Sequence, residues 1–417
     1  MDKSNPGSIS FAKFIPSAVT LFALCIGLMA IKYSFEQNWY YATSLLLFAA
    51  ILDAVDGRLA RFLNSTSEFG AELDSLADFV NFGVVPAFII YNWINKFVKF
   101  KKEILEEGKP QATRKSSAKI LEFFTKEIDF LISGSADLTG SVGTKTSSTE
   151  SLSAENYNNR YIHYGIREHG MAGMMNGMSL YGGILPLSGT FLVFADYMKP
   201  AIRLASMMQR QIFYIFTHDS IGLGEDGPTH QAVEHLANLR SIPNLNVFRP
   251  CDDFETLACY EMALNSKNTP SAFSLTRQNL AFSTQKENPD IYKGGYIIYS
   301  NNEDPDLSIL ATGSEVEIAI EASKKLLDEK NITSKVISIP CFEIFDSQSE
   351  EYRNKILGNK NNLKIAVEAA IKQGWEKYIG DKGSFIGMNS FGASGKYQDL
   401  YQHFGITAEN IVKQIKI

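Results

Sequence analysis

Residues 87–117 read AFIIYNWINKFVKFKKEILEEGKPQATRKSS. The stretch begins with apolar side chains typical of a membrane segment, and within a few turns it becomes rich in Lys and Glu, as soluble segments are. We infer that two different kinds of protein meet near residues 95–98. The averages of the whole chain hide this division, because 417 residues that are 45% hydrophobic with a net charge of -6 look like an ordinary acidic soluble protein.

The part before this junction has the pattern of a membrane protein. Apolar residues fill 14–31, 39–52 and 79–94, and the first run is long enough to cross a hydrocarbon core of about 30 Å. A signal peptide is the alternative for the first run, but no A-x-A site follows it and two more apolar runs do. The third run contains polar residues and Pro and is followed by lysines. We expect it to lie in the interface or not to span stably, which would leave the rest of the chain cytoplasmic.

Four carboxylates lie between the second and third apolar runs, in DAVDGRLARFLNSTSEFGAELDSLAD (residues 53–78). Asp53 and Asp56 are three positions apart on one helical face, and Asp74 and Asp78 are four apart on the next. Converging carboxylates repel one another unless cations bridge them, and oxygen ligands suit Mg²⁺ or Mn²⁺, which would in turn hold a diphosphate. The alternative, a solvated acidic loop, does not explain the full pattern D-x2-D-G-x2-A-R-x8-G-x3-D-x3-D.

That pattern resembles the CDP-alcohol phosphatidyltransferase family, and the first apolar run looks like the start of a bacterial phosphatidylserine synthase. The resemblance implies that the metal ligands are Asp53, Asp56 and Asp74, with Asp78 beside them as the base that activates the incoming alcohol. It also implies that CDP-diacylglycerol is bound with the help of Gly57, Arg61 and Gly70. The family builds its site within about six helices, whereas three apolar runs are present here. We therefore expect a metal site without the helices that complete the lipid and alcohol sites.

From residue 98 onward the periodicity changes to that of a soluble α/β chain. Short β-rich runs such as QIFYIFTHD, LNVFRP, SAFSLTR and LSILATGSE alternate with helix-like segments, which predicts mainly parallel sheets. A polar, turn-rich stretch at 284–296 predicts a boundary between two domains. The predicted organisation is: membrane helices 1–96, linker 97–111, a first soluble domain 112–285 and a second 294–417.

The composition excludes several classes of function. Neither part is basic enough to indicate a nucleic-acid partner. The four cysteines are far apart and have no CxxC spacing, so they predict neither a disulfide framework nor a cysteine metal site.

Three stretches of the soluble part carry most of its chemistry: RYIHYGIREHGMAGMMNG (160–177), GTFLVFADY (189–197) and THDSIGLGEDGPTHQAVEH (217–235). Glu168 lies in an apolar context that would raise its pKa unless a partner holds the charge. Aromatic residues recur every third position, at Phe191, Phe194 and Tyr197, a spacing found more often in cores than in cofactor platforms. The Gly-rich loop favours a polar substrate site over buried core histidines, because it gathers His218, Asp219, Asp226 and His230.

Together these stretches resemble the second half of transketolase. GSADLTGS, GIREHGM, GEDGPTHQ, LTRQNL and ATGSEVEIA follow one another in the family's order, and the resemblance runs from residue 112 to the C-terminus. It implies a pyrimidine-binding domain and a C-terminal domain. It also implies that Glu168 hydrogen-bonds the aminopyrimidine N1′ of thiamine diphosphate, while Phe191, Phe194 and Tyr197 surround the pyrimidine.

The same resemblance implies the substrate residues. The sugar phosphate would be bound by Arg114, Ser141, His218 and Arg277, since the guanidinium fork matches phosphate oxygens. Asp226 and His230 would contact hydroxyls near the reacting carbons, which makes them, with Glu168, the candidate catalytic residues of this half. The implied reaction is the transfer of a two-carbon ketol unit between sugar phosphates.

One expected part of a transketolase has no match in this sequence. The family grips the diphosphate through a divalent metal at a GDG-type motif, and no GDG with a downstream Asn occurs here. Because the family binds its cofactor between two chains, we expect a dimer, thiamine diphosphate shared with a partner chain, and a separate chain that supplies the diphosphate-binding domain. The alternatives are a CDP-alcohol phosphatidyltransferase that contacts membrane lipid and carries a soluble appendage, and an inactive fusion.

Overall fold

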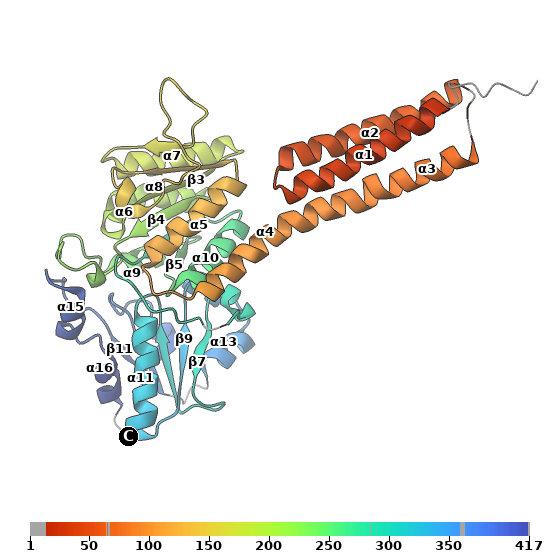
Figure 1. Ribbon diagram of the computed structural model, residues 1–417. Helices are drawn as coiled ribbons and strands as arrows, with labels where there is room; N and C mark the ends of the chain where they lie inside the picture. The colour runs from red at the N-terminus through yellow and green to blue at the C-terminus, as the bar shows by residue number, and fades with distance from the viewer. Residues whose placement is uncertain (1–13, 64, 66, 285, 359–362, 416–417) are drawn as a thin grey trace, which may run out of the picture. The chain divides into compact units, whose positions relative to one another are not determined.

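The computed structural model describes residues 14–63, 65, 67–284, 286–358 and 363–415 (Figure 1). The chain forms two compact units, Met1–Glu103 and Ile104–Ile417. The first contains helices alone, and the second contains two β-sheets covered by helices.

The N-terminal unit begins with α1 (Ile15–Phe35) and α2 (Trp39–Phe62), followed by α3 (Glu68–Asp78), a π-helical turn η2 (Phe79–Val84) and α4 (Val85–Glu107). Side chains start two of these helices: Asn38 accepts a hydrogen bond from the Tyr41 amide, and Ser67 accepts one from the Gly70 amide. A Cβ on Gly27 would lie 1.9 Å from Asn81 Oδ1, so glycine is needed where α1 and η2 meet.

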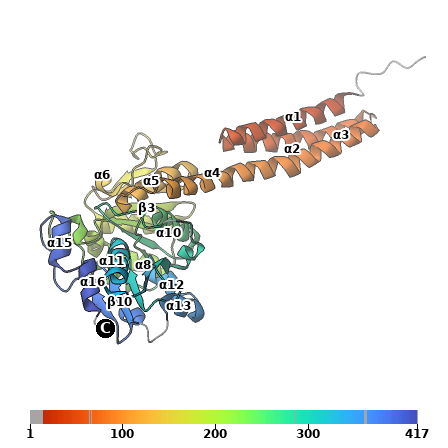
Figure 2. The ribbon, with the colours of Figure 1, turned by 60° about the horizontal axis from the view of Figure 1, so that its bottom comes forward.

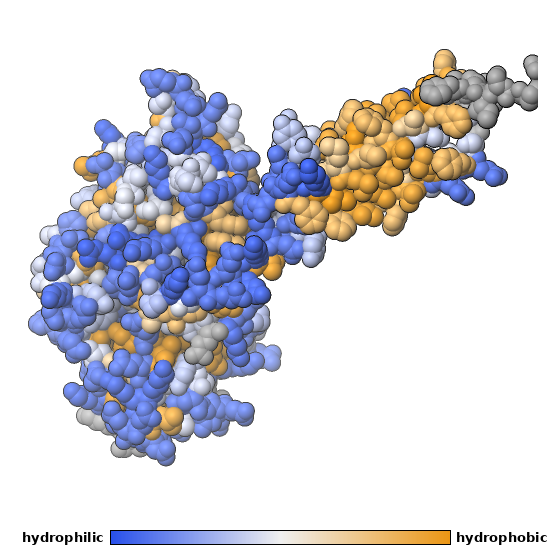
Figure 3. All heavy atoms as spheres, in the orientation of Figure 1, coloured by the Kyte–Doolittle hydropathy of each residue, from blue (hydrophilic) through white to orange (hydrophobic). Residues whose placement is uncertain are grey.

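The outer surface of this unit is apolar. Large side chains such as Phe22, Leu47, Phe48 and Ile90 are about half exposed, and they form the orange surface of the helices in Figure 3. Among the described residues, two helices are long and apolar enough to cross a membrane, Ile15–Phe35 and the continuous helix Glu68–Glu107. The apolar run at 39–52 lies in α2, which is not one of them.

The structure differs from expectation after residue 78. The run at 79–94, expected to be a weak, interrupted segment, is continuous helix, and residues 97–107 of the expected linker are the last turns of α4. Pro86 has no amide hydrogen for the helical ladder, and the wider π-helical turn just before it accommodates the gap. Pro86, which looks like a helix break in the sequence, therefore lies within a continuous helix.

The first sheet of the C-terminal unit is fully parallel. Its strands are β1 (Leu131–Ser135), β2 (Tyr161–His163), β3 (Leu185–Phe191), β4 (Phe213–Thr217), β5 (Asn246–Phe248) and β6 (Ser271–Leu275), in the order β2-β1-β3-β4-β6-β5. Every residue of β3 and β4 is buried, as expected for central strands covered by helices on both faces.

The helices around this sheet are α5 (Thr113–Glu127), α6 (Thr139–Val142), α7 (Glu168–Tyr181), α8 (Ala195–Met207), α9 (His235–Arg240) and α10 (Asp253–Asn265), with short 3-10 turns η3 (Leu192–Phe194) and η4 (Ile221–Leu223). Helix α5 packs on α10, and α7 packs on α8 and β3. In a parallel sheet the loops after the strands gather at one edge, so the segments that follow β3, β4 and β6 come together there.

The second sheet has the order β11-β10-β8-β9-β7, and only its edge strand β7 runs antiparallel. The strands are β7 (Tyr296–Ser300), β8 (Leu307–Ala311), β9 (Ser334–Ser338), β10 (Leu363–Val367) and β11 (Ser384–Ile386). The turn η5 (Pro289–Lys293) leads into it, and its helices are α11 (Glu315–Lys330), α12 (Phe342–Asp346), α13 (Glu350–Leu357), α14 (Glu376–Ile379), α15 (Tyr397–His403) and α16 (Ala408–Gln414). Helix α11 packs on β8 and β9, and Figure 2 labels it in the same part of the molecule as β10 and α16. The predicted α/β class with mainly parallel sheets is confirmed.

A buried ionic network joins the two sheets. Arg249, which follows β5, is fully buried, and its Nε donates to Asp219 Oδ2 over 2.9 Å. Its Nη1 donates to the Thr312 carbonyl oxygen over 2.9 Å and to the Glu315 carboxylate at the start of α11. Residues before and after the predicted domain boundary thus share one set of buried charges, which we call the Arg249 network.

Glu368, at the end of β10, is the third carboxylate of the Arg249 network. Arg240 donates to both of its oxygens over 2.9 Å, and Trp375 Nε1 donates to Oε2 over 2.8 Å. Burial would raise the pKa of Glu368, but Arg240 and Arg249 outweigh it and hold the pKa at about 2. The carboxylate therefore stays ionised inside the protein.

Candidate functional site

Three aromatic rings stack in series where β3 ends. Phe191 is the last residue of β3, Phe194 lies in η3, and Tyr197 lies in the first turns of α8. The Phe191 and Phe194 centroids are 5.9 Å apart with an angle of 7° between the planes, and those of Phe194 and Tyr197 are 6.1 Å apart at 27°. Phe191 is buried, whereas Tyr197 is 64% exposed, so this ring stack opens to the surface at one end.

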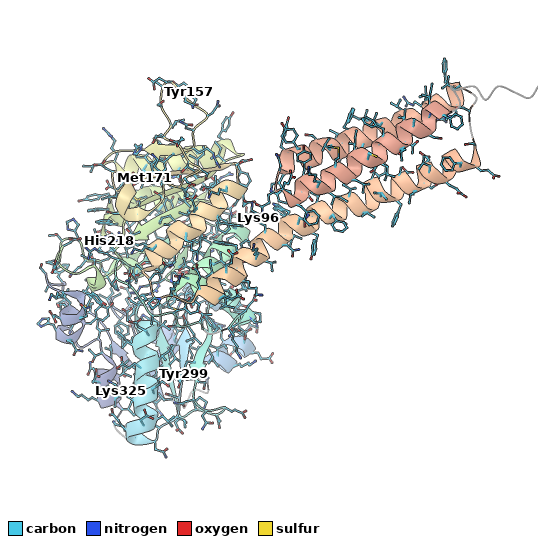
Figure 4. All side chains as sticks on the ribbon, in the orientation of Figure 1. Lys96, Tyr157, Met171, His218, Tyr299 and Lys325 are labelled. Atoms are coloured by element: carbon cyan, nitrogen blue, oxygen red, sulfur yellow. The ribbon has the colours of Figure 1, made fainter. Side chains whose placement is uncertain are left out.

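Two histidines lie against the ring stack. The His218 imidazole, just after β4, lies 3.7 Å from the Phe191 ring centroid at 27°. The His230 ring approaches Phe191 and Phe194 edge-on, at 6.4 Å and 5.8 Å. His218 has a φ of 60°, the left-handed conformation that non-glycine residues adopt at a cost. Figure 4 labels His218 at this edge of the first sheet.

Two arginines complete this edge of the site. Arg114 in the first turn of α5 donates from Nη1 to the Ser141 carbonyl oxygen over 2.9 Å, and Arg277 after β6 donates from Nη1 to the Leu223 carbonyl oxygen over 2.9 Å. The start of α5 is tied to the end of β6, because the Thr113 amide donates to Thr276 Oγ1 over 3.0 Å. The fold thereby brings together two guanidinium groups from distant parts of the sequence.

The electrostatics of this edge favour an anion. Burial, and then the charges of Arg114, Arg277 and His230, lower the pKa of His218 to about 3, so its imidazole is neutral at physiological pH. Burial and the neighbouring Arg277 also lower the pKa of Arg114. Cations held this close are stabilised by a bound anion such as a phosphate.

Glu168 begins α7, the helix that packs against α8 and β3, and Figure 4 labels Met171 in its first turn. The residue is 8% exposed. Within the described part of the chain its carboxylate makes no hydrogen bond or ion pair, and a nearly buried carboxylate without a partner fits a ligand that supplies one.

The Gly-rich loop 224–230 is held by the domain of the second sheet. Gln231 Nε2 donates to the Gly224 carbonyl oxygen over 2.9 Å and to that of Ala393 over 2.8 Å. Ser394 Oγ donates to the Glu225 carbonyl oxygen over 2.6 Å. The loop brings His230 to the ring stack, whereas Asp226 is exposed.

A second candidate site lies in the N-terminal unit. Oxygens of Asp53, Asp56 and Asp74 lie within 4.8 Å of one another, and Asp78 lies near Asp53. We call these four residues the aspartate cluster. Thr20 Oγ1 donates to Asp56 Oδ2 over 2.5 Å.

The aspartate cluster has the donor set that a divalent cation needs. Asp53 Oδ1 is buried without a hydrogen-bond partner among the described residues, which fits a role as a cation ligand. A cavity of about 290 Å³ adjoins the cluster, lined among others by Asp56, Asp74, Gly57, Arg61 and Gly70. The Arg61 side chain donates from Nε to the Gly57 carbonyl oxygen over 3.0 Å.

Three family models match the chain. Residues 109–283 match the pyrimidine-binding domain of transketolase, residues 294–407 match the transketolase-like C-terminal domain, and residues 13–102 match CDP-alcohol phosphatidyltransferase. The chain joins segments of two enzyme families. The transketolase segment contains the ring stack, and the CDP-alcohol phosphatidyltransferase segment contains the aspartate cluster.

Known proteins support this division. A transketolase of Sinorhizobium medicae is 50% identical over 318 residues, which are 76% of this chain and 46% of the relative. The solved transketolase of Leishmania mexicana matches with a TM-score of 0.70 and 33% identity, over 87% of this chain and 57% of that one. A solved structure described as a split gene transketolase, inactive beta4 tetramer, matches with a TM-score of 0.59 and 25% identity, over 73% of this chain and 96% of that one. The chain spans about half the length of the curated transketolases it matches.

The structure brings most of the expected residues of the transketolase segment to one edge of the first sheet. They are Arg114, Ser141, Phe191, Phe194, Tyr197, His218, His230 and Arg277. Asp226 is exposed on its loop, and Glu168 belongs to the neighbouring helix α7. Sequence reasoning missed Gln231, which fixes the loop, and Thr113, which positions Arg114, because neither carries a charge or a motif spacing that would single it out.

Proposed function

We propose that the transketolase segment transfers a two-carbon ketol unit between sugar phosphates with thiamine diphosphate. The observation that carries this proposal is the ring stack with His218 and His230 on it and Arg114 and Arg277 beside it. Stacked rings suit a flat heteroaromatic cofactor, and paired guanidinium groups suit a phosphate. When bound, the cofactor supplies an electron sink for the breaking carbon–carbon bond.

The proposed roles follow the position of each group. The unpaired carboxylate of Glu168 would accept a hydrogen bond at the pyrimidine N1′, while Phe191, Phe194 and Tyr197 hold the ring. The sugar phosphate would be bound by Arg114, Ser141, His218 and Arg277. His230 and Asp226 would contact the substrate hydroxyls near the reacting carbons, which requires the exposed loop residue Asp226 to approach the bound substrate.

We also propose that the segment acts as a dimer and with a separate chain that supplies the diphosphate-binding half. Helices α7 and α8 expose large apolar residues: Met174, Leu180, Tyr181, Leu204 and Met207 are 53%, 49%, 88%, 48% and 61% exposed. Exposed apolar surface of this kind marks interaction sites. The match to the structure described as a split gene transketolase supports the proposal of a second chain. The division 1–96, 97–111, 112–285 and 294–417 along the sequence is part of the proposal.

A ketol-transfer assay tests this proposal. The full chain, purified in detergent, is assayed for transfer from a ketose phosphate to an aldose phosphate, alone and with a separately expressed transketolase diphosphate-binding domain. We expect transfer only in the mixture and only weak binding of thiamine diphosphate by the chain alone. Submicromolar binding by the chain alone would refute the need for a partner, and a mixture without transfer would refute the proposed reaction.

The aspartate cluster supports a second candidate function, CDP-alcohol phosphatidyl transfer at a membrane. Its carboxylates and the cavity beside them suit Mg²⁺ or Mn²⁺ and a diphosphate. The assay is release of cytidine monophosphate from CDP-diacylglycerol, with Asp56→Asn as the matched control. Release that depends on Asp56 would establish this activity. If neither this assay nor the ketol-transfer assay is positive, the chain is an inactive fusion.

The apolar surface of the N-terminal unit supports a membrane location for the chain. The two helices long enough to cross a bilayer and the match to a lipid-synthesising family agree with it. We place the transketolase segment on the cytoplasmic side, where sugar phosphates are made. The lysines at 96, 99, 101 and 102 favour that side by the positive-inside rule.

A further inference from the structure

A histidine and two carboxylates meet between α8 and α9, outside the ring stack. Asp196 lies in the first turn of α8, Glu234 precedes α9, and His235 is its first residue. One ligand atom from each lies within 4.8 Å of the others. We propose that Asp196, Glu234 and His235 bind a divalent transition-metal ion, with Zn²⁺ as the best match.

The distances suit a shared ion. His235 Nε2 lies 3.2 Å from Asp196 Oδ2, and His235 Nδ1 lies 3.8 Å from Glu234 Oε2. Zinc binds imidazole nitrogen and carboxylate oxygen at about 2.0–2.2 Å, so two ligand atoms on one tetrahedral ion are roughly 3.3 Å apart. The pair of Nε2 and Oδ2 already has this spacing. The 3.8 Å contact of Glu234 involves the other ring nitrogen, so Glu234 would have to turn towards the ion bound at Nε2. One ligand atom of each of the three residues already lies within 4.8 Å of the others.

The lack of hydrogen bonds from described residues at the His235 ring independently indicates that one of its nitrogens binds a ligand. Its side chain is only 5% exposed, yet neither ring nitrogen makes a hydrogen bond within the described part of the chain. The approach of Asp196 lacks the alignment of an N–H···O bond. Buried imidazole nitrogens are normally satisfied by hydrogen bonds or metal ions. The side chains of Asp196 and Glu234 are 54% and 41% exposed, so an ion can enter from solvent.

The ligand set separates this site from the aspartate cluster. Carboxylates alone prefer Mg²⁺ or Mn²⁺, whereas an imidazole beside two carboxylates favours Zn²⁺ and its neighbours in the first transition series. An ion here would fasten the first turn of α8 to α9. Because Tyr197 follows Asp196 directly, the metal would also fix the open end of the ring stack.

Cobalt(II) is the probe for the first experiment, because its visible absorption reports the ligand geometry directly. The full chain in detergent is freed of metal and titrated with Co²⁺, then with Zn²⁺ as competitor. We expect bound Co²⁺ to give a visible absorption band, and we expect Zn²⁺ to displace Co²⁺ and abolish this band. His235→Gln and Asp196→Asn should each weaken binding at least about tenfold, since each removes a ligand. His403→Gln, at an exposed histidine, should bind like the parent.

A second measurement separates the loss of a metal ligand from misfolding of His235→Gln, which changes a buried residue. Asp196 is half exposed, so Asp196→Asn should fold like the parent, as circular dichroism would verify. Zn²⁺ should raise the Tm of the parent, because a ligand that binds only the folded state stabilises it, and should raise the Tm of Asp196→Asn by less at the same Zn²⁺ concentration. Absent Co²⁺ binding, or binding that both variants retain, would overturn the proposal and leave His235 as a plain ion-pair partner.

Discussion

The imidazole of His218 is expected to stay neutral well below the pH at which a free histidine takes up a proton. Its pKa in the folded protein is about 3, mainly because of burial and then because of Arg114 and Arg277. In the unfolded chain it has an ordinary pKa of about 6.5. Between these values the unfolded state binds more protons than the folded state, so His218 reduces stability as the pH falls from about 6.5 towards 3.

Replacing this histidine should therefore make the protein less sensitive to acid. His218→Asn is suitable because Asn accepts the left-handed backbone that position 218 requires. We expect the drop in Tm between pH 7 and pH 5 to be smaller for His218→Asn than for the parent. His403→Asn, at an exposed position, serves as the control and should behave like the parent. Equal acid sensitivity of His218→Asn and the parent would show that His218 becomes protonated in the folded state.

Glu168 offers a test that separates chemistry from structure. Glu168→Gln keeps the shape of the side chain but removes the charge that would polarise the pyrimidine. In the chain reconstituted with a diphosphate-binding partner, we expect exchange of the thiazolium C2 proton of thiamine diphosphate to slow by about 10²-fold or more, measured by quenched-flow NMR. The circular dichroism spectrum should not change. Exchange at the parental rate would assign Glu168 to structure instead.

The role of a single residue could be predicted from the sequence only where the residue belongs to a recognisable motif. The stretches around Glu168 and His218 indicated chemistry because each places polar groups where a packed core would not. The aromatic spacing at Phe191 is more typical of a core, and only the family resemblance gave it a role. The exposure of Asp226 was not predictable, since it depends on how the loop is anchored to Ala393, far along the chain. The approach of Asp196 to His235 depends on the packing of α8 against α9 and left no spacing in the sequence.

At the scale of elements, the Arg249 network holds β5, the segment after β4, α11 and β10 together. Arg249→Met would leave the carboxylates of Asp219, Glu315 and Glu368 buried with less compensating charge. Removing one partner of a buried ion pair costs about 3–5 kcal/mol, so we expect a loss of this order in the free energy of unfolding. Chemical denaturation followed by circular dichroism measures it.

A surface ion pair gives the matched control for Arg249→Met. Lys126 pairs with Glu122 over 2.7 Å on α5, and both side chains are partly exposed. Lys126→Met should cost about 0–1 kcal/mol, because solvent screens such pairs. If Arg249→Met proved no more costly than Lys126→Met, the network would not stabilise the fold.

The elements themselves were predictable where periodicity was strong. The alternation of short buried runs with amphipathic segments gave the parallel sheets, because a strand covered on both faces must be apolar throughout. The Arg249 network was not predictable, since its members lie on four elements that only the completed fold brings together. The continuity of the helix through Pro86 and its extension over residues 97–107 were not predicted, because Pro86 and Asn81 look like breaks and the π-helical turn before the proline has no sequence signature.

For the whole molecule, the decisive question is which side of the membrane holds the transketolase segment. We expect a single cysteine at position 115, an exposed position of α5, to resist a membrane-impermeant thiol reagent in intact cells when the native cysteines have been removed. A cysteine at position 38, between α1 and α2, should react there. Permeabilised cells provide the control, in which both positions should react. Labelling of both positions in intact cells would place the transketolase segment outside, away from sugar phosphates.

The Arg249 network limits which C-terminal domains could replace the one in this chain. The stretch around residues 284–293 looks like a natural place to exchange one C-terminal domain for another. A transplanted domain would have to supply acidic partners where Glu315 and Glu368 now meet Arg249 and Arg240. A donor domain without these acidic residues would leave Arg249 and Arg240 buried without these ionic partners. The two domains of this segment therefore depend on each other for their buried charges. A library of domain swaps should yield soluble protein only from donor domains that carry acidic residues at the positions of Glu315 and Glu368.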